Sequence, residues 1–351
     1  MAVHRIDVTS FLNLATEHLI IDVRSPAEFE HAHIPKAFSL PLFTNDQRKV
    51  VGTTYKQQSR EEAIKIGLDY FGPNMKSIVV QVEQLLQKKN TKTVLVHCWR
   101  GGMRSAAIAW LLDLYGFKVY TLQGGYKAFR NWALQQFIAP YPLQVLGGFT
   151  GSAKTETLLV MQQRQQIVID LEGLANHKGS AFGSLGMIAQ PSTEMFENIL
   201  ALELRQALIK ISNTPQNCIW VEAESQRIGN INIPMEFFKQ MQAAPYLLVN
   251  IPFEERLNFI VSAYGKFEKA ELINATLRIK KRLGGLETKT AINFLLEDNV
   301  KDCFALLLQY YDKYYKKSKL GNEPMVQSIE FNDINATLNA SKIIEWKSQQ
   351  V

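Results

Sequence analysis

The sequence has little cysteine, and this limits the covalent and metal chemistry that it can support. Only Cys98, Cys218 and Cys303 occur in 351 residues, far apart and without a Cys-x-x-Cys pair. An odd number of isolated cysteines disfavours both a disulfide framework and a structural zinc site. We therefore interpret Cys218 and Cys303 as buried apolar residues, whereas Cys98 stands in a distinctive context that is described below.

Long apolar segments are also missing. A membrane-spanning helix needs about 18 uninterrupted apolar residues, and the nearest candidate, residues 105–117, is interrupted by Asp113. The first residues, MAVHRIDVTSFLN, lack the basic, apolar and small-residue zones of a signal peptide. We expect a cytoplasmic protein with no membrane partner.

The composition is that of a folded protein with a basic bias. Hydrophobic residues make up 46% of the chain and charged residues 21%, and 39 Lys and Arg against 33 Asp and Glu give a net charge of +6. A chain of 351 residues exceeds the size at which one core stops growing, which predicts two or three domains. The positive charge favours a polyanionic partner, nucleic acid before a membrane surface.

The order of apolar and helical segments predicts an α/β fold. Short β-branched runs alternate with helical stretches up to residue 125, which indicates a parallel sheet. A helical stretch ends at Pro140 and Pro142, and a second α/β unit then begins with a strand, a glycine-rich turn and a helix. The predicted domains are 1–137 and 138–252, both α/β, and a helical, basic region over 253–351 that packs on the second domain.

Residues 96–105, VHCWRGGMRS, place Cys98 directly after an apolar strand. In an open parallel sheet this position is the carboxyl edge, where ligands bind. Two glycines let the turn curl so that backbone N–H groups converge on the sulfur, while the helix start, Arg100 and Arg104 add positive potential. This setting stabilises the thiolate and predicts an exposed nucleophile. The alternative is a half-buried structural cysteine beside two solvated arginines.

Two chemistries share this turn. The spacing of His97-Cys98, five residues, then Arg104-Ser105 is the H-C-x5-R-S pattern of cysteine-dependent phosphatases, whose turn holds a tetrahedral oxyanion. Residues 19–41, LIIDVRSPAEFEHAHIPKAFSLP, resemble instead the opening of rhodanese domains, which carry a chalcogen on this cysteine as a persulfide. The matching residues are Asp22, Arg24, Glu28, Phe29, His33, Ile34, Pro35 and Ala37. The seven-residue loop is wide enough for a phosphate-sized group, so the resemblance also permits a chalcogenophosphate donor.

A second anion-binding turn is predicted at residues 147–156, GGFTGSAKTE, between a strand and a helix. The P-loop template G-x-x-x-x-G-K-[ST] is matched except that Ala153 replaces the last glycine. If that position requires a positive φ, alanine costs about 1 kcal/mol there. The predicted phosphate-binding residues are Gly148, Thr150, Gly151, Ser152, Lys154 and Thr155, which offer N–H groups at a helix start and one cation. The alternative is a glycine-rich turn without a ligand.

Two carboxylates follow apolar strands of the second unit. Asp170 ends the run QQIVID, and Glu222 lies in NCIWVEAES. Either could act as an acid or base, or support a magnesium ion in the manner of a Walker B residue. Both are equally well explained as helix caps or structural ion pairs, so the sequence leaves a metal requirement open.

Three further segments narrow the interpretation. Residues 170–183 (DLEGLANHKGSAFG), 221–234 (VEAESQRIGNINIP) and 280–285 (KKRLGG) resemble signature blocks of bacterial tRNA 2-selenouridine synthases, and the similarity runs from about residue 8 to 320. The resemblance implies a rhodanese-like domain followed by a P-loop-like domain. It also implies replacement of sulfur by selenium in 2-thiouridine at the tRNA wobble position, through an S-geranyl intermediate made from geranyl diphosphate. Selenophosphate is then the selenium donor, its producing enzyme a partner to consider, and no tightly bound cofactor is expected.

Under this resemblance each turn receives a role. The P-loop with Lys154 grips the diphosphate of geranyl diphosphate, helped by Lys178 or Arg227. Lys178 stands where an arginine is expected, and it keeps the charge but lacks the bidentate fork. Cys98 takes selenium from selenophosphate as a selenylsulfide. The residues assigned to this transfer are Cys98, Arg100 and Arg104 as catalytic groups, with Trp99, Gly101, Gly102 and Met103 as the selenophosphate cradle.

The basic helical segment supplies cations for RNA. The predicted tRNA-binding residues are Arg278, Lys280, Lys281, Arg282, Lys313, Lys316 and Lys317. Tyr310, Tyr311, Tyr314 and Tyr315 are interleaved with the last of these and could stack on an unpaired anticodon base. A tyrosine row at helical spacing is equally typical of core packing, and a lysine run of a solvated face.

Two other functions stay open from the residues alone. A cysteine-dependent phosphatase or P-loop regulatory protein would release phosphate from an aryl phosphate through Cys98. A stand-alone persulfide carrier would transfer sulfur from thiosulfate without any need for tRNA. Modification of tRNA is the interpretation that uses both turns and the three signature blocks.

Overall fold

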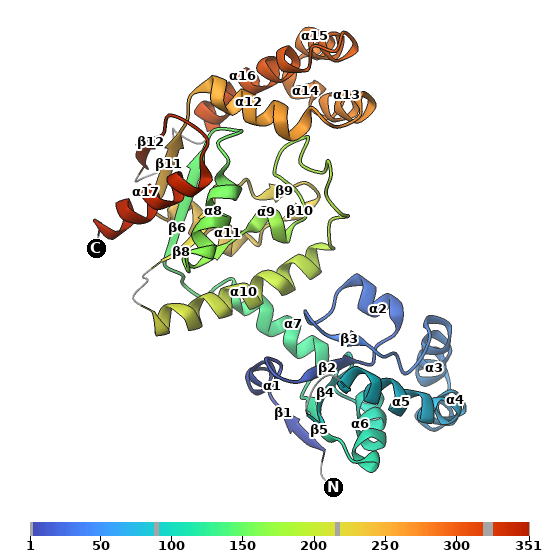
Figure 1. Ribbon diagram of the computed structural model, residues 1–351. Helices are drawn as coiled ribbons and strands as arrows, with labels where there is room; N and C mark the ends of the chain where they lie inside the picture. Colours follow the sequence, from blue (N-terminus) through green and yellow to red (C-terminus); the bar gives the residue numbers. More distant parts are fainter. Residues whose placement is uncertain (1–2, 88–90, 215–217, 319–325, 351) are drawn as a thin grey trace. The chain divides into compact units, whose positions relative to one another are not determined.

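The computed structural model describes residues 3–87, 91–214, 218–318 and 326–350 of the chain. The chain divides into two compact units, Met1–Gln135 and Gln136–Val351, which are described separately below (Figure 1). The basic helical region that the sequence predicts after residue 252 belongs to the second unit.

A five-stranded parallel sheet forms the centre of the first unit, with strand order β1-β5-β4-β2-β3. The strands are β1 (His4–Ile6), β2 (Leu19–Asp22), β3 (Phe38–Ser39), β4 (Thr93–His97) and β5 (Lys118–Leu122). Asp22 at the end of β2 lies opposite His97 at the end of β4. The rhodanese-like motif and the Cys98 turn therefore meet at one edge of the sheet.

Helices flank this sheet, so its central strand is apolar on both faces. Val94, Leu95 and Val96 of β4 are completely buried, as expected for a parallel strand that is covered on both sides. The helices are α1 (Val8–Leu14), α2 (Pro26–His31), α3 (Asn45–Gln57), α4 (Arg60–Phe71), a 3-10 turn (Gly72–Asn74), α5 (Met75–Leu86), α6 (Met103–Tyr115) and α7 (Gly125–Gln136). A capping box formed by Ser25 and Glu28 fixes the start of α2.

The second unit contains another five-stranded parallel sheet, with strand order β12-β11-β6-β8-β7. Its strands are β6 (Leu143–Gly148), β7 (Val168–Ile169), β8 (Ile219–Glu222), β11 (Tyr246–Asn250) and β12 (Val326–Glu330). A separate antiparallel pair consists of β9 (Arg227–Ile228) and β10 (Ile231–Asn232). Because both large sheets are parallel, the predicted α/β fold class is confirmed.

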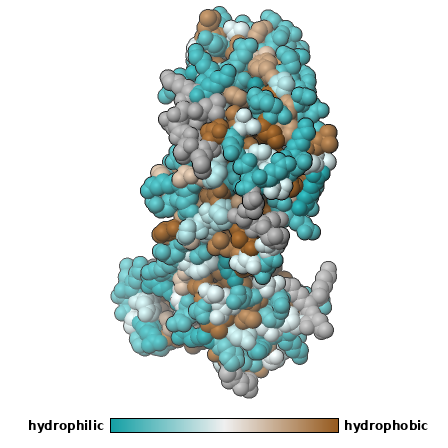
Figure 2. Space-filling view, turned by 90° about the vertical axis from the view of Figure 1, so that its left-hand side faces the viewer, coloured by the Kyte–Doolittle hydropathy of each residue, from teal (hydrophilic) through white to brown (hydrophobic). Residues whose placement is uncertain are grey.

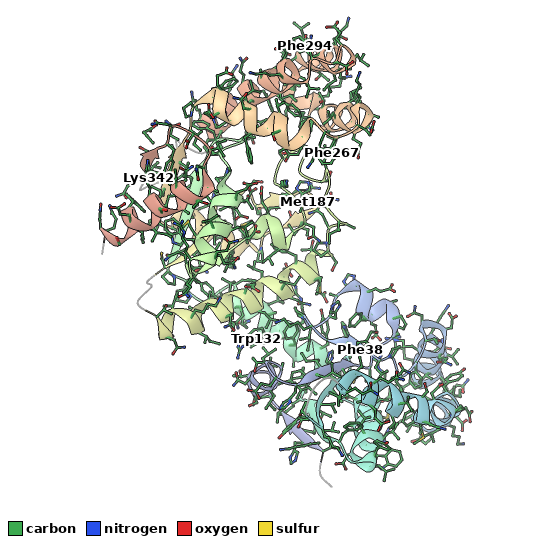
Figure 3. All side chains as sticks on the ribbon, in the orientation of Figure 1. Phe38, Trp132, Met187, Phe267, Phe294 and Lys342 are labelled. Atoms are coloured by element: carbon green, nitrogen blue, oxygen red, sulfur yellow. The ribbon has the colours of Figure 1, made fainter. Side chains whose placement is uncertain are left out.

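The helices of the second unit form two groups. Around the sheet lie α8 (Lys154–Gln163), α9 (Leu171–Leu174), α10 (Thr193–Asn213), α11 (Met235–Ala243) and α17 (Ala336–Ser348). A helical layer comprises α12 (Phe253–Tyr264), α13 (Lys269–Arg278), α14 (Lys280–Leu283), α15 (Gly285–Leu296) and α16 (Val300–Ser318). This layer has its own apolar core, to which Phe267 and Phe294 contribute (Figure 3). Phe182, from the loop before α10, joins the same core and links the layer to the α/β part.

One strand lies where the sequence predicted only helices. β12 extends the sheet beyond β11, and Phe331, which directly follows it, is buried against the sheet core. The Nζ atom of Lys342 on α17 lies 5.6 Å from the centre of the Phe331 ring (Figure 3). The side chains of β12 are mostly exposed, so the strand lacks the apolar alternation from which it could be predicted.

None of the helices that the structure describes is long and apolar enough to cross a membrane. On the face drawn in Figure 2, apolar residues lie in separate patches between hydrophilic ones. Isolated exposed apolar side chains of this kind are normal on a folded protein.

Candidate functional site

The Cys98 turn connects β4 to α6 and is fixed against the start of α7. Gly101 has a φ of +64°, and a Cβ atom there would lie 2.6 Å from the carbonyl oxygen of Leu122. The N–H groups of Tyr126 and Lys127 donate to the carbonyls of Cys98 and Trp99, at 2.8 and 2.9 Å. Only glycine fits at residue 101, which explains the glycine of the motif.

The backbone donors of this turn are available to a ligand. Within the part of the chain that the structure describes, the N–H groups of residues 99–102 donate no hydrogen bond to the protein. They lie just before the first turn of α6, where the helix dipole favours an anion. The geometry fits the predicted anion cradle.

The Cys98 thiol itself differs from the prediction of an exposed nucleophile. Cys98 is only 3% exposed, and it packs in an apolar cluster with Val96 and Ile108. Its Sγ atom lies 3.2 Å from the hydroxyl of Ser105, which in turn lies 3.1 Å from the carbonyl oxygen of Gly102. The side chain is buried because the turn folds its backbone, and not the sulfur, toward solvent.

The predicted cradle residues divide between exposed and engaged side chains. Trp99 and Met103 are 37% and 47% exposed, and Arg100 is exposed. Arg104 is not free, because it donates to both carboxylate oxygens of Glu28 at 2.6 and 3.3 Å. Burial raises the Glu28 pKa, but the hydrogen bond and charge of Arg104 outweigh this and hold it below its usual value. The side chain of Arg104 therefore serves a structural ion pair here.

A buried ion pair supports the turn. Arg24, 1% exposed, donates to Asp22 at 2.6–3.0 Å and to the Ala32 carbonyl at 2.7 Å. Its guanidinium carbon lies 3.9 Å from the centre of the Tyr126 ring, and the backbone N–H of Tyr126 donates to the carbonyl of Cys98. A buried charge of this kind is tolerated only when it is fully hydrogen-bonded. These motif residues hold the fold of the turn and do not line it.

The predicted P-loop lies between β6 and α8, as its template requires. Ala153, in the position of the last template glycine, has a φ of +51°. From the sequence we expected strain at this position if it requires a positive φ. The structure has this conformation, and the alanine that adopts it is 5% exposed. Gly151 has a φ of +82°, and a Cβ atom on it would lie 2.8 Å from Cδ1 of Ile260 on α12. The loop is thus closely packed on the helical layer.

The polar side chains of the P-loop make bonds to the loop and to one carboxylate. Lys154 Nζ donates to the Gly148 carbonyl at 2.9 Å, and Ser152 Oγ to the Phe149 carbonyl at 2.6 Å. Thr155 Oγ1 donates to Glu172 at 3.0 Å. Lys154 therefore lies across the loop opening, where a phosphate group would meet it.

Of the two predicted carboxylates, Asp170 is a helix cap. It accepts from the Gly173 N–H at 2.7 Å at the start of α9. Glu222 is completely buried and accepts from the Glu172 N–H at 2.6 Å. Burial, with the charges of Asp170 and Glu172 added, raises the Glu222 pKa well above its usual value. The cap explanation thus holds for Asp170, and Glu222 favours the protonated form.

Glu172 and Glu224 are cavity residues that the sequence reasoning missed. Burial, together with the charge of Glu224, raises the Glu172 pKa to about 8. Both residues lie inside the family-like segments 170–183 and 221–234, two positions after Asp170 and Glu222 respectively. Their place in these segments is the feature from which they could have been predicted. Among the described residues no group of three or more His, Cys, Asp or Glu side chains is placed to hold a metal ion.

A cavity of about 1180 Å³ collects most of the other predicted residues of the second unit. Those that line it are Gly148, Thr150, Gly151, Ser152, Lys154, Thr155, Lys178, Arg227, Arg278, Lys281 and Arg282. Of the remaining cations, Lys280, Lys313 and Lys316 are exposed outside this lining. The side chain of Lys317 lies outside the described residues. The cavity therefore brings the predicted phosphate-binding residues together with three of the predicted RNA-binding cations, Arg278, Lys281 and Arg282.

Part of the cavity lining is apolar and aromatic. It comes mainly from the helical layer and includes Ile260, Tyr264, Phe304, Leu308 and Tyr311. Burial raises the pKa of Tyr264 and of Tyr311 to about 12, so both rings are uncharged. Tyr314 at the rim is 51% exposed, and the Arg282 guanidinium lies 6.0 Å from its ring. The tyrosine row is thus partly core and partly accessible surface.

Comparison with known proteins agrees with this architecture. Residues 141–342 match the family model of the tRNA 2-selenouridine synthase AAA domain, and residues 8–131 match that of the rhodanese-like domain. A tRNA 2-selenouridine synthase of Sulfurovum sp. (strain NBC37-1) is 33% identical over 329 residues, which cover 84% of this chain and 87% of that one. Those of Hydrogenovibrio crunogenus and Shewanella sediminis are each 36% identical and cover 76% of this chain, and 76% and 75% of theirs. The chain therefore belongs to the tRNA 2-selenouridine synthase family.

Proposed function

We propose that this protein replaces the sulfur of 2-thiouridine at the tRNA wobble position with selenium, through an S-geranyl intermediate. Family membership supports tRNA selenation. The observation that carries the finer proposal is the cavity of the second unit, whose lining combines the P-loop with aromatic and aliphatic side chains. A ligand with a diphosphate head and an apolar chain matches both surfaces, and geranyl diphosphate has this form.

In the first step the cavity transfers the geranyl group to the sulfur of the base. The allylic C–O bond of geranyl diphosphate breaks, an S–C bond forms, and diphosphate leaves with both bonding electrons. The N3 proton of 2-thiouridine is released in the same step and passes to the departing diphosphate or to water. Lys154, with Lys178 and the loop N–H groups, stabilises the charge that develops on the leaving group. The buried ring of Phe304 and the half-buried ring of Tyr264 shield the allylic carbon from water. The rim cations Arg278, Lys281 and Arg282 bind the tRNA backbone.

In the second step Cys98 acts on selenophosphate. Selenium in this donor is at the level of selenide, so a selenylsulfide on Cys98 would leave phosphorus in a reduced state. Attack of the Cys98 thiolate on phosphorus needs no redox partner, but it requires the turn to move so that the buried sulfur can reach the donor. A P–S bond then forms, the P–Se bond breaks, and hydrogen selenide leaves with a proton. The N–H groups of residues 99–102, which donate no hydrogen bond within the described part of the chain, suit a phosphoryl group. The arginine of the H-C-x5-R-S spacing, Arg104, would have to leave Glu28 to contribute.

The hydrogen selenide then attacks C2 of the S-geranyl base, and geranylthiolate departs. The proton of hydrogen selenide passes to the base, giving 2-selenouridine, and water hydrolyses the phosphocysteine to restore Cys98. Alkylation turns the C2=S thione into a C2–S–C thioether, so the sulfur can leave as a monoanionic thiolate and need not leave as sulfide, which explains why alkylation comes first. The substrates of this scheme are tRNA, geranyl diphosphate and selenophosphate, and the enzyme that makes selenophosphate is the proposed supplier.

Two substitutions separate the steps. Lys154→Ala should lower geranyl transfer by about 100-fold, because a preorganised charge at the leaving group is lost, while Lys239→Ala, an exposed lysine paired with Glu236, should not. Cys98→Ser should accumulate S-geranyl tRNA, whereas Cys303→Ser, at a buried cysteine of the second unit, should still form 2-selenouridine. Geranyl transfer unchanged in Lys154→Ala, or selenation at the normal rate in Cys98→Ser, would remove the assigned role.

A further inference from the structure

Arg256 on α12 contacts the P-loop although nothing in the sequence distinguishes it. Arg256 is only 4% exposed. Its guanidinium donates to the carbonyls of Ile251 and Thr150 at 3.1 and 3.0 Å, and to both carboxylate oxygens of Asp312 on α16 at 2.9 and 2.7 Å. Arg256 therefore joins the P-loop, α12 and α16 at a single buried side chain.

The bond to Thr150 sets the orientation of one peptide of the loop. A trans peptide is planar, so the Gly151 N–H points opposite to the Thr150 carbonyl that Arg256 holds. If this peptide rotated, a carbonyl oxygen would take the place of the N–H donor, and an oxygen repels a phosphate group. Arg256 thus keeps one donor of the anion site in its binding orientation.

α16 makes two more contacts with the same loop. The hydroxyl of Tyr315 accepts from the Gly148 N–H at 3.1 Å and also contacts the hydroxyl of Tyr246. Its ring lies against Phe149, with the ring centres 5.1 Å apart. Asp312 and Tyr315 are three residues apart and share one side of the helix. This side of α16 therefore bonds Gly148 and contacts the ring of Phe149 through Tyr315, and it reaches Thr150 only through the pairing of Asp312 with Arg256.

The remainder of α16 is available for RNA. Lys313 and Lys316 are exposed, and Tyr314 is 51% exposed. A tRNA phosphate or base that binds these side chains acts on the same rigid helix that carries Asp312 and Tyr315. The position of α16 and the shape of the P-loop are thus not independent.

We propose that Arg256 is a positioning residue that, through Asp312, makes diphosphate binding at the P-loop depend on tRNA contact with α16. The inference rests on the proposed function, since it assumes that the P-loop binds diphosphate. Binding of tRNA holds α16 in place and thereby keeps the Thr150–Gly151 peptide in its binding orientation. By linkage, diphosphate must strengthen tRNA binding by the same factor.

The test uses calorimetric titration of the full chain with inorganic diphosphate, with and without saturating tRNA that contains 2-thiouridine. We expect tRNA to tighten diphosphate binding about tenfold in the wild-type protein. Asp312→Asn should weaken diphosphate binding and reduce the effect of tRNA to less than about twofold, because Arg256 loses its charged partner. Tyr315→Phe removes only one hydroxyl, so it should reduce the effect of tRNA less than Asp312→Asn does. It is the test variant if Asp312→Asn does not fold.

The matched control is Glu254→Gln. Glu254 on α12 and Lys301 on α16 form a second ion pair between the same two helices, 3.7 Å apart and exposed. Because this pair does not touch the P-loop, the tenfold effect should persist in Glu254→Gln. An equal effect of tRNA in the wild-type protein and in folded Asp312→Asn and Tyr315→Phe, or no effect in the wild type, overturns the proposal. A wild-type protein that binds no diphosphate overturns the proposed function and the coupling with it.

Discussion

Ala153 holds the left-handed conformation of the P-loop without being glycine. Its φ of +51° brings Cβ close to the following carbonyl, which costs about 1 kcal/mol for an alanine. The residue is 5% exposed, so packing of the surrounding loop fixes a conformation that the isolated residue disfavours. The strain lies directly before Lys154, at the site proposed to bind diphosphate.

Replacing Ala153 by glycine should therefore stabilise the second unit. We expect Ala153→Gly to raise the free energy of unfolding by about 0.5–1 kcal/mol, since glycine adopts positive φ without strain. Ala305→Gly, inside helix α16, should lower it by about 1 kcal/mol. Urea unfolding of both variants measures the difference. Equal destabilisation by the two substitutions would mean that residue 153 carries no strain.

Glu172 gives the stability of the protein a pH dependence. Its pKa is about 8 in the folded chain and about 4.3 in an unfolded one. Between these values the folded state keeps a proton that the unfolded state has released, so this group makes stability fall as pH rises from about 5 to 8. In Glu172→Gln that contribution is absent. The variant should gain about 1–3 kcal/mol relative to wild type between pH 5 and pH 8 in urea unfolding. Two curves that stay parallel over this range would contradict the assignment.

At the residue scale, sequence reasoning predicted identities better than partners. The spacing of the P-loop template located Lys154 and the positive φ at Ala153. Sequence spacing did not indicate that Arg104 pairs with Glu28, because Glu28 lies 76 positions away in the chain. Arg256 was missed for the same reason, since its contacts with Thr150 and Asp312 exist only in the folded chain.

At the scale of elements, the second sheet depends on its C-terminal strand and helix. β12 forms one edge of this sheet, and α17 packs against α8, the helix that begins with Lys154. Phe331, Ala340 and Ile343 from this segment are buried in the same apolar cluster as Leu158 of α8. The segment after residue 325 therefore supports the helix that presents the P-loop lysine.

Truncation of one side chain tests this dependence. Phe331→Ala should lower the free energy of unfolding by about 3 kcal/mol, because a buried aromatic ring is removed and a cavity remains. Leu338→Ala on the exposed face of α17, where the leucine is 55% exposed, should cost less than about 1 kcal/mol. Calorimetric melting compares the two. A similar small effect for both would show that β12 and α17 are not part of the cooperative core.

Elements with strong apolar patterns were predictable, and those held by contacts distant in sequence were not. The buried runs of β4 and β6 and the glycine turns that follow them indicated two parallel sheets. β12 carries mostly exposed side chains, so only its pairing with β11 defines it. The tyrosines of α16 are close in sequence but have different environments, because Tyr311 is half-buried in the cavity lining, Tyr315 bonds the P-loop and Tyr314 is exposed.

At the scale of the whole molecule, each unit contains one of the two turns that are proposed to bind anions. Cys98 belongs to the unit Met1–Gln135 and Lys154 to the unit Gln136–Val351. The net charge of +6 attracts a polyanion to the protein as a whole. In the proposed function the cations that line the cavity, Arg278, Lys281 and Arg282, fix the place at which the tRNA is held.

The affinity for tRNA should depend strongly on salt, and the cations that line the cavity should contribute part of this salt dependence. Lys281→Ala should lower the slope of log K against log salt by about 1, because one phosphate contact is lost. Lys210→Ala, at the exposed end of α10, should leave the slope unchanged. Filter binding over a range of salt concentrations measures both. Equal slopes for the three proteins would place the tRNA away from the cavity.

The central claim is that one chain alkylates the sulfur at the P-loop cavity and then exchanges it for selenium with the help of Cys98. The most direct measurement is a time course of tRNA nucleosides by mass spectrometry, with geranyl diphosphate and selenophosphate added together or singly. We predict S-geranyl-2-thiouridine with geranyl diphosphate alone, 2-selenouridine with both, and unchanged 2-thiouridine with selenophosphate alone. Formation of 2-selenouridine at full rate without geranyl diphosphate would contradict the account.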